Sequence, residues 1–202
     1  MADADPSDTQ AHDRARRSAS RFTRRDGLLT TLGDVFESRG YDGATLSLLS
    51  AATGLGKASL YHHFPGGKAD MAAALLRDRV ALLERLAFSR LQGSQPPAVR
   101  LAEFIDGFRE YVQDGQQNCL LLIFREGTAG ARHGENIARQ YADWQSRLAA
   151  TFAESGLKPK RAERAAAELL SSLYGALVTA RLTGNPDTFK RQAKRLRKTL
   201  PA

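Results

Sequence analysis

Apolar residues recur at intervals of three and four along almost the whole chain, and this spacing constrains the fold more than any other feature. A sustained alternation of apolar and polar residues between turn dipeptides, which is typical of strands, is absent from the sequence. Glycine and proline mark the connections between helices, including the glycine-rich run 127–134. The sequence therefore predicts an all-α protein. The expected helices cover about residues 24–39, 45–53, 57–63, 68–91, 97–114, 118–127, 135–155, 159–183 and 187–199.

Length and composition describe an ordinary folded chain. The 202 residues suit one large or two small domains, and with 42% hydrophobic residues the chain can bury a sizeable core. A single cysteine, Cys119, cannot form an internal disulfide, which favours a reducing compartment. The longest charge-free stretch of the second half, residues 169–180, is too short to span a membrane, and acidic residues stand where a secretory signal carries positive charge. We expect a cytoplasmic protein without a membrane partner.

The net charge of +8 is concentrated at one end of the chain. Residues 1–70 contain 9 basic and 9 acidic side chains, residues 71–156 contain 10 of each, and residues 157–202 contain 11 basic and 3 acidic side chains. The expected last helix places Phe189 and Leu196 at helical intervals between its cations. We therefore interpret it as an amphipathic helix that docks at a dimer edge with its cationic face in solvent, attraction to a membrane or to nonspecific DNA being secondary.

Two short helices joined by a tight glycine turn stand near the start of the chain. The first of them opens at Thr45, a residue type that caps helices, and ends before Gly54. After the connection Gly54-Leu55-Gly56, a second short helix directs Leu60 and Phe64 inward. The pattern indicates a helix-turn-helix, whose second helix enters the DNA major groove. The small side chains of Ala58 and Ser59 would allow that helix to approach the bases closely.

The stretch from Phe22 to Met71 resembles the DNA-binding domain of the TetR family of bacterial transcriptional regulators. The motifs that carry the resemblance are Phe36-x-x-x-Gly40-Tyr41-x-x-x-Thr45, Thr53-Gly54-Leu55 and Ser59-Leu60-Tyr61-His62-His63-Phe64-Pro65-x-x-Lys68. The residues that the resemblance places on DNA are Lys57, Ala58, Ser59, Tyr61 and His62, with Thr45 and Lys68 on the phosphate backbone. Backbone amides near Thr45 and Lys68, at the starts of their helices, are further candidates for phosphate contacts.

Three positions depart from the family pattern. Gly56 stands where a capping Ser or Thr is common, and Leu48 stands where the residue is often polar. The turn Pro65-Gly66-Gly67 is one residue longer than in many members and resembles a multidrug-type subgroup. Two readings stay open elsewhere: Tyr61 contacts phosphate or lies at the core edge, and the six arginines of residues 14–25 form a solvated run or an arm that enters the minor groove.

The sequence contains no complete signature of an enzyme or of a metal site. The segment around Gly54 and Lys57 lacks the first glycine and the Ser or Thr of a phosphate-binding loop. His62 and His63 are adjacent and diverge by about 100° on a helix, so they do not form a metal site. Cys119 opens an apolar run, where a thiol is typically a buried small hydrophobe. We expect no enzyme activity, no catalytic residue, no metal and no cofactor.

The rest of the chain resembles the family in general pattern, which implies a helical domain that binds a small effector. We expect an apolar, aromatic effector in a cavity between helices, although a filled core explains the same residues. The candidate effector-binding residues are Phe104, Phe108, Tyr111, Leu121, Phe124, Arg125, Tyr141 and Trp144. The segment 168–182 is apolar on more than one side, which favours burial against a second chain. The candidate dimer residues are Leu169, Leu173, Ala176, Leu177, Ala180, Phe189 and Leu196.

These observations predict three regions: a tail over residues 1–20, a three-helix helix-turn-helix domain over residues 21–67, and an effector-binding and dimerisation domain over residues 68–202. The expected protein is a homodimeric regulator, a repressor that binds a palindromic operator in double-stranded DNA and is released by a small effector. The main alternative is an architectural or nonspecific DNA-binding protein without an effector. A helical enzyme that uses Cys119 or the histidines is a weaker one.

Overall fold

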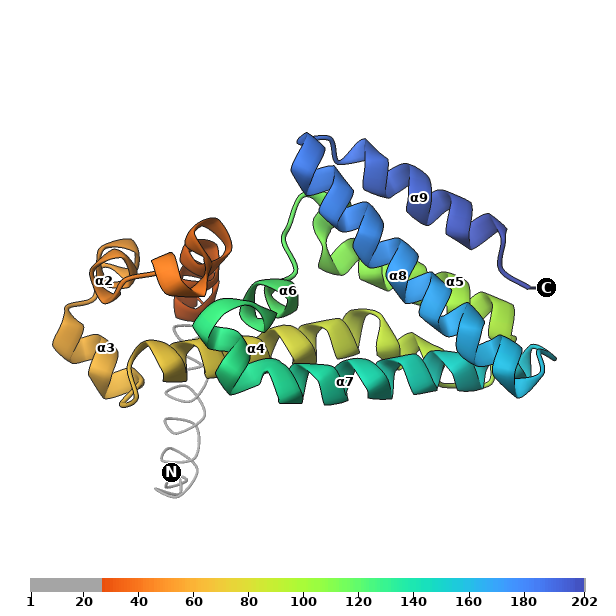
Figure 1. Cartoon of the computed structure of the whole chain (residues 1–202), viewed down its shortest axis with the longest axis horizontal. Coiled ribbons are helices and arrows are strands. Elements are labelled where there is room, and N and C mark those ends of the chain that lie inside the picture. Colours follow the sequence, from red (N-terminus) through yellow and green to blue (C-terminus); the bar gives the residue numbers. More distant parts are fainter. Residues whose placement is uncertain (1–26, 202) are drawn as a thin grey trace, which may run out of the picture. The chain divides into compact units, whose positions relative to one another are not determined.

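The structure, a computed structural model, describes residues 27–201 and divides into two compact units that meet between Leu75 and Leu76. Every regular element of the described residues is a helix (Figure 1), which confirms the all-α prediction. None of these helices is both long enough and apolar enough to cross a membrane. The predicted tail over residues 1–20 and the arginines of residues 14–25 lie outside the described residues.

The first unit contains a helix over 27–43, α2 (Leu46–Thr53), α3 (Lys57–His63) and the beginning of α4 (Lys68–Leu86). Gly40 adopts a left-handed conformation (φ 68°), which a residue with a side chain rarely does, so the sequence needs glycine near the end of the first of these helices. The core of the unit consists of side chains with no exposed surface: Leu32, Phe36, Leu49, Leu60 and Met71. All three helices and the start of α4 contribute to this core.

The second unit is built around two long antiparallel helices, α7 and α8, with α9 packed along α8 (Figure 1). A short 3-10 helix, η1, follows α4, and α5 packs on it. The elements of this unit after α4 are η1 (Phe88–Leu91), α5 (Pro97–Tyr111), η2 (Gln113–Gly115), α6 (Leu120–Arg125), α7 (Gly127–Glu154), α8 (Pro159–Thr183) and α9 (Asp187–Lys198).

Two helix boundaries differ from the sequence prediction. The glycine-rich run 127–134 was expected to separate two helices, but it forms the first two turns of α7. A Cβ atom at Gly130 would overlap the carbonyl oxygen of Arg125, and one at Gly134 would lie 2.9 Å from Arg125 Nη1. These glycines therefore allow α6 to approach α7 closely instead of ending the helix. The expected helix over 68–91 is in fact α4 followed by η1.

The turn after α4 is held by polar contacts that the sequence pattern did not reveal. Arg100, which is only 6% exposed, donates to the carbonyl oxygens of Leu91 (2.7 Å) and Gln95 (3.0 Å), and it pairs with Glu154. A Cβ atom at Gly107 would overlap the carbonyl oxygen of Leu86, so α5 crosses the end of α4 at the shortest possible distance. Arg100 of α5 therefore holds the end of η1 and the loop that follows it.

Glu84 joins the end of α4 to α7. Its carboxylate accepts hydrogen bonds from Trp144 Nε1 and from Arg147 Nη1 (2.8 Å to each carboxylate oxygen). Arg147 also donates to the carbonyl oxygen of Phe88 (3.0 Å), and its guanidinium lies 5.3 Å from the centre of the Phe88 ring. The buried indole N–H of Trp144 thus has an acceptor, and the partly exposed Glu84 and Arg147 pair with each other.

Candidate nucleic-acid interface

The helix-turn-helix is fixed by local hydrogen bonds that the sequence dictates. Thr45 caps α2, because its Oγ1 accepts from the backbone amide of Leu48 (3.3 Å). Gly54 follows α2 in the left-handed conformation (φ 67°), and Ser50 Oγ donates to the carbonyl oxygen of Leu55 (2.6 Å) across the turn. The conformation of the connection 54–56 is thereby set before α3 begins.

The short helix α3 presents one side to the core and the rest to solvent. Leu60 has no exposed surface, and Phe64, just after the helix, is 3% exposed. All five residues of α3 that the sequence analysis placed on DNA are exposed: Lys57, Ala58, Ser59, Tyr61 and His62. A seven-residue helix depends on such packing for its stability, so its buried side determines which side chains are exposed. Contact of these residues with DNA stays a prediction.

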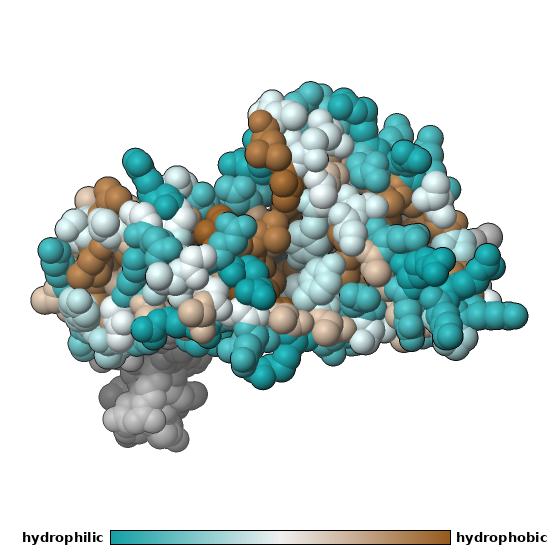
Figure 2. All heavy atoms as spheres, in the orientation of Figure 1, coloured by the Kyte–Doolittle hydropathy of each residue, from teal (hydrophilic) through white to brown (hydrophobic). Residues whose placement is uncertain are grey.

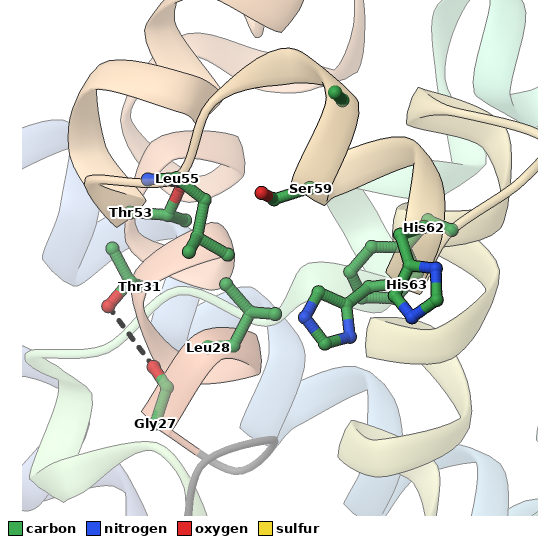
Figure 3. Close-up of a pocket in the computed structure, with 10 residues that line it drawn as sticks. Gly27, Leu28, Thr31, Thr53, Leu55, Ser59, His62 and His63 are labelled. Atoms are coloured by element: carbon green, nitrogen blue, oxygen red, sulfur yellow. Dashed lines mark hydrogen bonds between the residues drawn. The ribbon is translucent and has the colours of Figure 1, made fainter.

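A hollow of about 960 Å³ lies beside α3 in the first unit. Figure 3 shows that Ser59 and the two histidines of α3 line it together with Leu28 and Thr31 of the N-terminal helix. Lys57 and Tyr61 do not line it. The rings of His62 and His63 lie edge to face, with their centres 5.8 Å apart. Residues 27–201 contain no group of three or more His, Cys, Asp or Glu side chains that could hold a metal ion.

The turn before α4 contains two glycines, Gly66 and Gly67, and it packs against Tyr61. A Cβ atom at Gly67 (φ 64°) would lie 3.2 Å from the Tyr61 ring, which therefore packs against this glycine. Tyr61 remains 48% exposed, so its ring is an edge of the core while much of the side chain stays at the surface. The backbone amide of Gly66 donates to Asp70 Oδ2 (2.7 Å) and is not free for a phosphate.

Lys68 makes contacts within the protein that its expected role did not include. Its Nζ donates to the carbonyl oxygens of Tyr41 (2.9 Å) and Asp42 (3.5 Å), and it lies 4.5 Å from the centre of the Tyr41 ring. The ammonium group therefore ties the end of the N-terminal helix to the start of α4. A phosphate contact by Lys68 stays a prediction, and sequence spacing could not reveal a hydrogen bond across 27 residues.

Most of the aromatic residues expected to line an effector site form a cluster in the second unit, whereas Phe124 packs against His133 with ring centres 6.4 Å apart. Trp144 stacks on Phe88 with ring centres 4.7 Å apart, and Phe88 contacts Phe104 at 4.9 Å. Phe108 contacts Tyr174 at 5.3 Å. The members of the predicted set that are at least 96% buried are Phe104, Phe108, Tyr111, Leu121, Phe124 and Trp144. The rings contact one another, and the sequence analysis missed Phe88 and Tyr174.

Two polar side chains, Tyr174 and Cys119, lie in this cluster, and Cys119 is buried as the sequence analysis expected. The hydroxyl of Tyr174 and the thiol of Cys119 share a hydrogen bond, and burial raises the pKa of both groups. A buried thiol with a raised pKa is a poor nucleophile, which argues against an enzyme built on Cys119. Tyr141 is partly exposed, and burial raises its pKa as well. Arg125 is exposed and lies against Gly130 and Gly134 instead of facing the aromatic cluster.

Most of the residues expected at a dimer interface are buried inside the single chain. Leu173 and Phe189 have no exposed surface, and Leu169, Ala176, Leu177 and Ala180 are at most 9% exposed. Leu196 is half-buried. The neighbouring helices α7 and α9 cover them, so these side chains form the core of the second unit. Apolar periodicity cannot tell burial by the same chain from burial by a partner.

The exposed face of α8 carries a different set of residues at intervals of three and four. The set consists of Glu168, Ser171, Gly175, Val178 and Leu182. Leu182 is 82% exposed and Val178 is 43% exposed, and a Cβ atom at Gly175 would meet no neighbour within 4 Å. A hydrophobic patch is visible over the C-terminal end of α8 in Figure 2. Exposed apolar residues on one helix face are typical of a protein interface.

Comparison with known proteins gave matches over both units. Residues 28–75 match the family described as bacterial regulatory proteins, tetR family, and residues 97–195 match the C-terminal domain of LmrA/YxaF-like transcriptional regulators. The HTH-type transcriptional regulator LmrA of Bacillus subtilis (strain 168) is 21% identical over 168 residues, which cover 81% of this chain and 89% of LmrA.

Two solved structures share the fold. A TetR transcriptional regulator from Chloroflexus aurantiacus J-10-FL has a TM-score of 0.72 at 20% identity, over 87% of this chain and 93% of that one. AibR, solved in complex with isovaleryl coenzyme A and operator DNA, has a TM-score of 0.67 at 21% identity, over 88% of this chain and 98% of AibR. Both have a helix-turn-helix and a helical C-terminal domain in common with the predicted architecture.

Replacement of Lys68 by Met tests its contacts within the first unit. We expect Lys68→Met to lower the free energy of unfolding by about 1 kcal/mol, because the carbonyl oxygen of Tyr41 loses its donor. Lys57→Met, at an exposed position, is the matched control and should change the free energy by less than about 0.5 kcal/mol. Denaturant unfolding followed by circular dichroism measures both, and equal stability of the two variants would contradict the contact.

Proposed function

The chain belongs to the TetR family of bacterial regulatory proteins, and from this premise we propose that it represses transcription as a homodimer that a small apolar effector releases from a palindromic operator. As a member of this family it is a transcriptional regulator and not an enzyme. The observation that carries the proposal is the side-chain arrangement of α3, where Leu60 is buried and the five candidate DNA residues are exposed.

Recognition of the operator would begin at the first turn of α3. Lys57, Ala58 and Ser59 stand in the first turn of α3, where a recognition helix approaches base edges. The small side chains of Ala58 and Ser59 would permit close approach, and the ammonium group of Lys57 would reach a base or a phosphate. Tyr61 and Thr45 offer hydroxyl groups at the edge of this surface for phosphate oxygens. A single α3 reads a few base pairs, so a two-fold dimer that reads two half-sites about 34 Å apart is needed for a specific operator.

The dimer would form through the exposed face of α8. Its exposed residues recur at helical intervals, they include the two apolar side chains Val178 and Leu182, and Gly175 allows a second helix to approach closely. An interface related by a two-fold axis brings the same face of both chains together, so this single stripe would supply both sides. The buried residues of α8, including Leu173 and Leu177, would support the interface from below without contacting the partner.

The effector would bind in the second unit near the aromatic cluster. Aromatic and apolar side chains from α5, α6 and α7 gather there, and Tyr174 of α8 lies against Phe108. The effector must bind the arrangement that does not bind DNA more tightly, and DNA must then weaken effector binding by the same factor. A coupling free energy of about 1–3 kcal/mol gives roughly 5–150-fold release.

The proposed regions are a tail (residues 1–20), a DNA-binding domain (residues 21–67) and a domain for the effector and for dimerisation (residues 68–202). The protein would act in the cytoplasm, where bacterial operator DNA lies. One buried cysteine and no second cysteine to pair with it fit a reducing compartment.

Selection of bound DNA from a random pool tests the operator. We expect a palindrome with two half-sites, lost when Lys57→Ala and Tyr61→Ala are combined, because both side chains lie on the exposed side of α3. Arg39→Ala, which removes an exposed cation from the N-terminal helix, is the matched control and should keep the palindrome. Recovery of unrelated sequences with weak preference would instead favour a nonspecific DNA-binding protein.

Titration of aromatic compounds against the operator-bound protein tests the effector. A compound that raises the melting temperature of the protein should also lower its operator affinity, by roughly 5–150-fold at saturation. The operator should lower the affinity for that compound by an equal factor, which calorimetry with and without DNA measures. Compounds that bind with the same affinity in both conditions would contradict the proposed coupling.

Sedimentation of an α8 variant tests the dimer. Val178→Glu combined with Leu182→Glu places two like charges on each side of a two-fold interface, so we expect a monomer at concentrations where the parent chain is a dimer. Val99→Glu, at a position 39% exposed on α5, is the control and should stay dimeric. A dimer that survives both glutamates would mean that another surface forms the interface.

A further inference from the structure

The cations at the end of the chain gather on one element, α9. Six of its twelve residues are basic, and its one acid is Asp187 at the first position. Hydrophilic side chains gather over α9 in Figure 2. The apolar side of the helix is in the core, since Phe189 and Ala193 have no exposed surface. The basic residues therefore cannot turn inward, and α9 holds them at fixed positions on the surface.

A groove of about 560 Å³ runs between α9 and α5, and basic side chains dominate its lining. The residues that line it are Asp106, Arg109, Lys190, Ala193, Lys194, Arg197 and Lys198. Five of these seven side chains are cationic and one is acidic. A hollow of this volume is in the range that small molecules occupy.

Two guanidinium groups are held in place across the groove by carboxylates. Arg197 Nη1 donates to Asp106 Oδ2 (2.6 Å), and Arg109 Nη1 donates to the other oxygen of Asp106 (3.4 Å). Arg109 Nε also donates to Asp114 Oδ1 (2.9 Å), and this hydrogen bond raises the pKa of Arg109. The groups that fix each guanidinium use only some of its five N–H donors, so the remaining donors can bind an anion.

Two lysines in the groove have no ion pair within residues 27–201. Lys190 pairs with Asp187 (3.2 Å), whereas Lys194 and Lys198 form no such pair. The three lysines follow one another at intervals of four residues, which brings them to one face of α9, where like charges repel. An anion between α9 and α5 would remove this repulsion and would use the free donors of the arginines.

We propose that the groove between α5 and α9 binds a small anion that carries two or more phosphate groups. Oriented guanidinium groups match phosphate oxygens in bidentate geometry, and lysines add point charges along a chain of phosphates. A polyphosphate group, free or as part of a nucleotide, spreads its charge over the length of such a groove. The concave shape and small volume favour a small molecule over the phosphates of a DNA duplex. All residues that line the site belong to the second unit.

Calorimetric titration of the full chain with inorganic triphosphate at low salt tests the site, because added salt screens exposed charges. We expect saturable binding with one triphosphate per chain. The double variant Lys194→Gln and Lys198→Gln should weaken it roughly five- to tenfold, since it removes two lining cations that no ion pair holds. Neither lysine has an ion pair among residues 27–201, so the melting temperature of this variant should match that of the parent chain.

The matched control is Arg191→Gln combined with Arg195→Gln. These two arginines are exposed on the same helix and do not line the groove. Because each double variant replaces two cations by glutamine, the control and the groove variant have the same net charge. It should change triphosphate affinity less than about twofold. Equal loss in both variants would show diffuse attraction to a basic helix and overturn the proposal. So would a groove variant that loses affinity for a non-operator DNA duplex and keeps its affinity for triphosphate.

Discussion

Burial of Leu60 is the constraint on which the DNA-binding end of the molecule depends. A helix of seven residues is not stable alone, and α3 has no side-chain cap because Gly56 precedes it. Leu60 joins a core made with Leu49 from α2, and the hydrogen bond from Ser50 to the Leu55 carbonyl fixes the turn between the two helices. With one side of α3 committed to this core, the directions of the exposed side chains follow. The buried residues of α3 therefore determine which of its side chains could reach DNA.

In the second unit, close contacts between helices determine how the elements pack. Gly107 lets α5 cross the end of α4, and Gly130 lets α7 cross the end of α6. Glu84 then joins α4 to α7 through Trp144 and Arg147, next to the aromatic cluster. An effector that displaced an aromatic ring of this cluster would act on the same contacts that hold the end of α4. Packed interfaces of this kind adopt discrete arrangements, and such arrangements are what a regulator needs.

Sequence reasoning predicted the features that neighbouring residues determine, such as caps and turns. It did not predict the contacts between segments that lie far apart in the chain. Thr45 as a cap, Gly54 in the turn and the inward Leu60 follow from residue types and spacing alone, and the structure has each of them. The contact of Lys68 with the Tyr41 carbonyl and the pairing of Tyr174 with Cys119 link distant segments, and no spacing rule contains them. The apolar residues of α8 were recognised as buried, but their cover is the same chain. The glycines of 127–134 were taken for breaks because a sequence does not show which backbone crosses a helix there.

The first unit and α9 carry their charges in different ways. The described part of the first unit, residues 27–75, contains three basic residues (Arg39, Lys57 and Lys68) and four acidic ones, and Lys68 is engaged with backbone carbonyls. Net charge among these described residues therefore does not favour phosphate, and in the proposed contact Lys57 would act through its position at the start of α3. On α9 the cations greatly outnumber the acids, and two of them stand in the groove without an ion pair among the described residues. In the two proposals, the positions of side chains would determine what the first surface binds, whereas charge density would determine what the groove binds. The salt dependence of triphosphate binding should consequently exceed that of discrimination between operator and random DNA, because screening acts on total charge more than on base contacts.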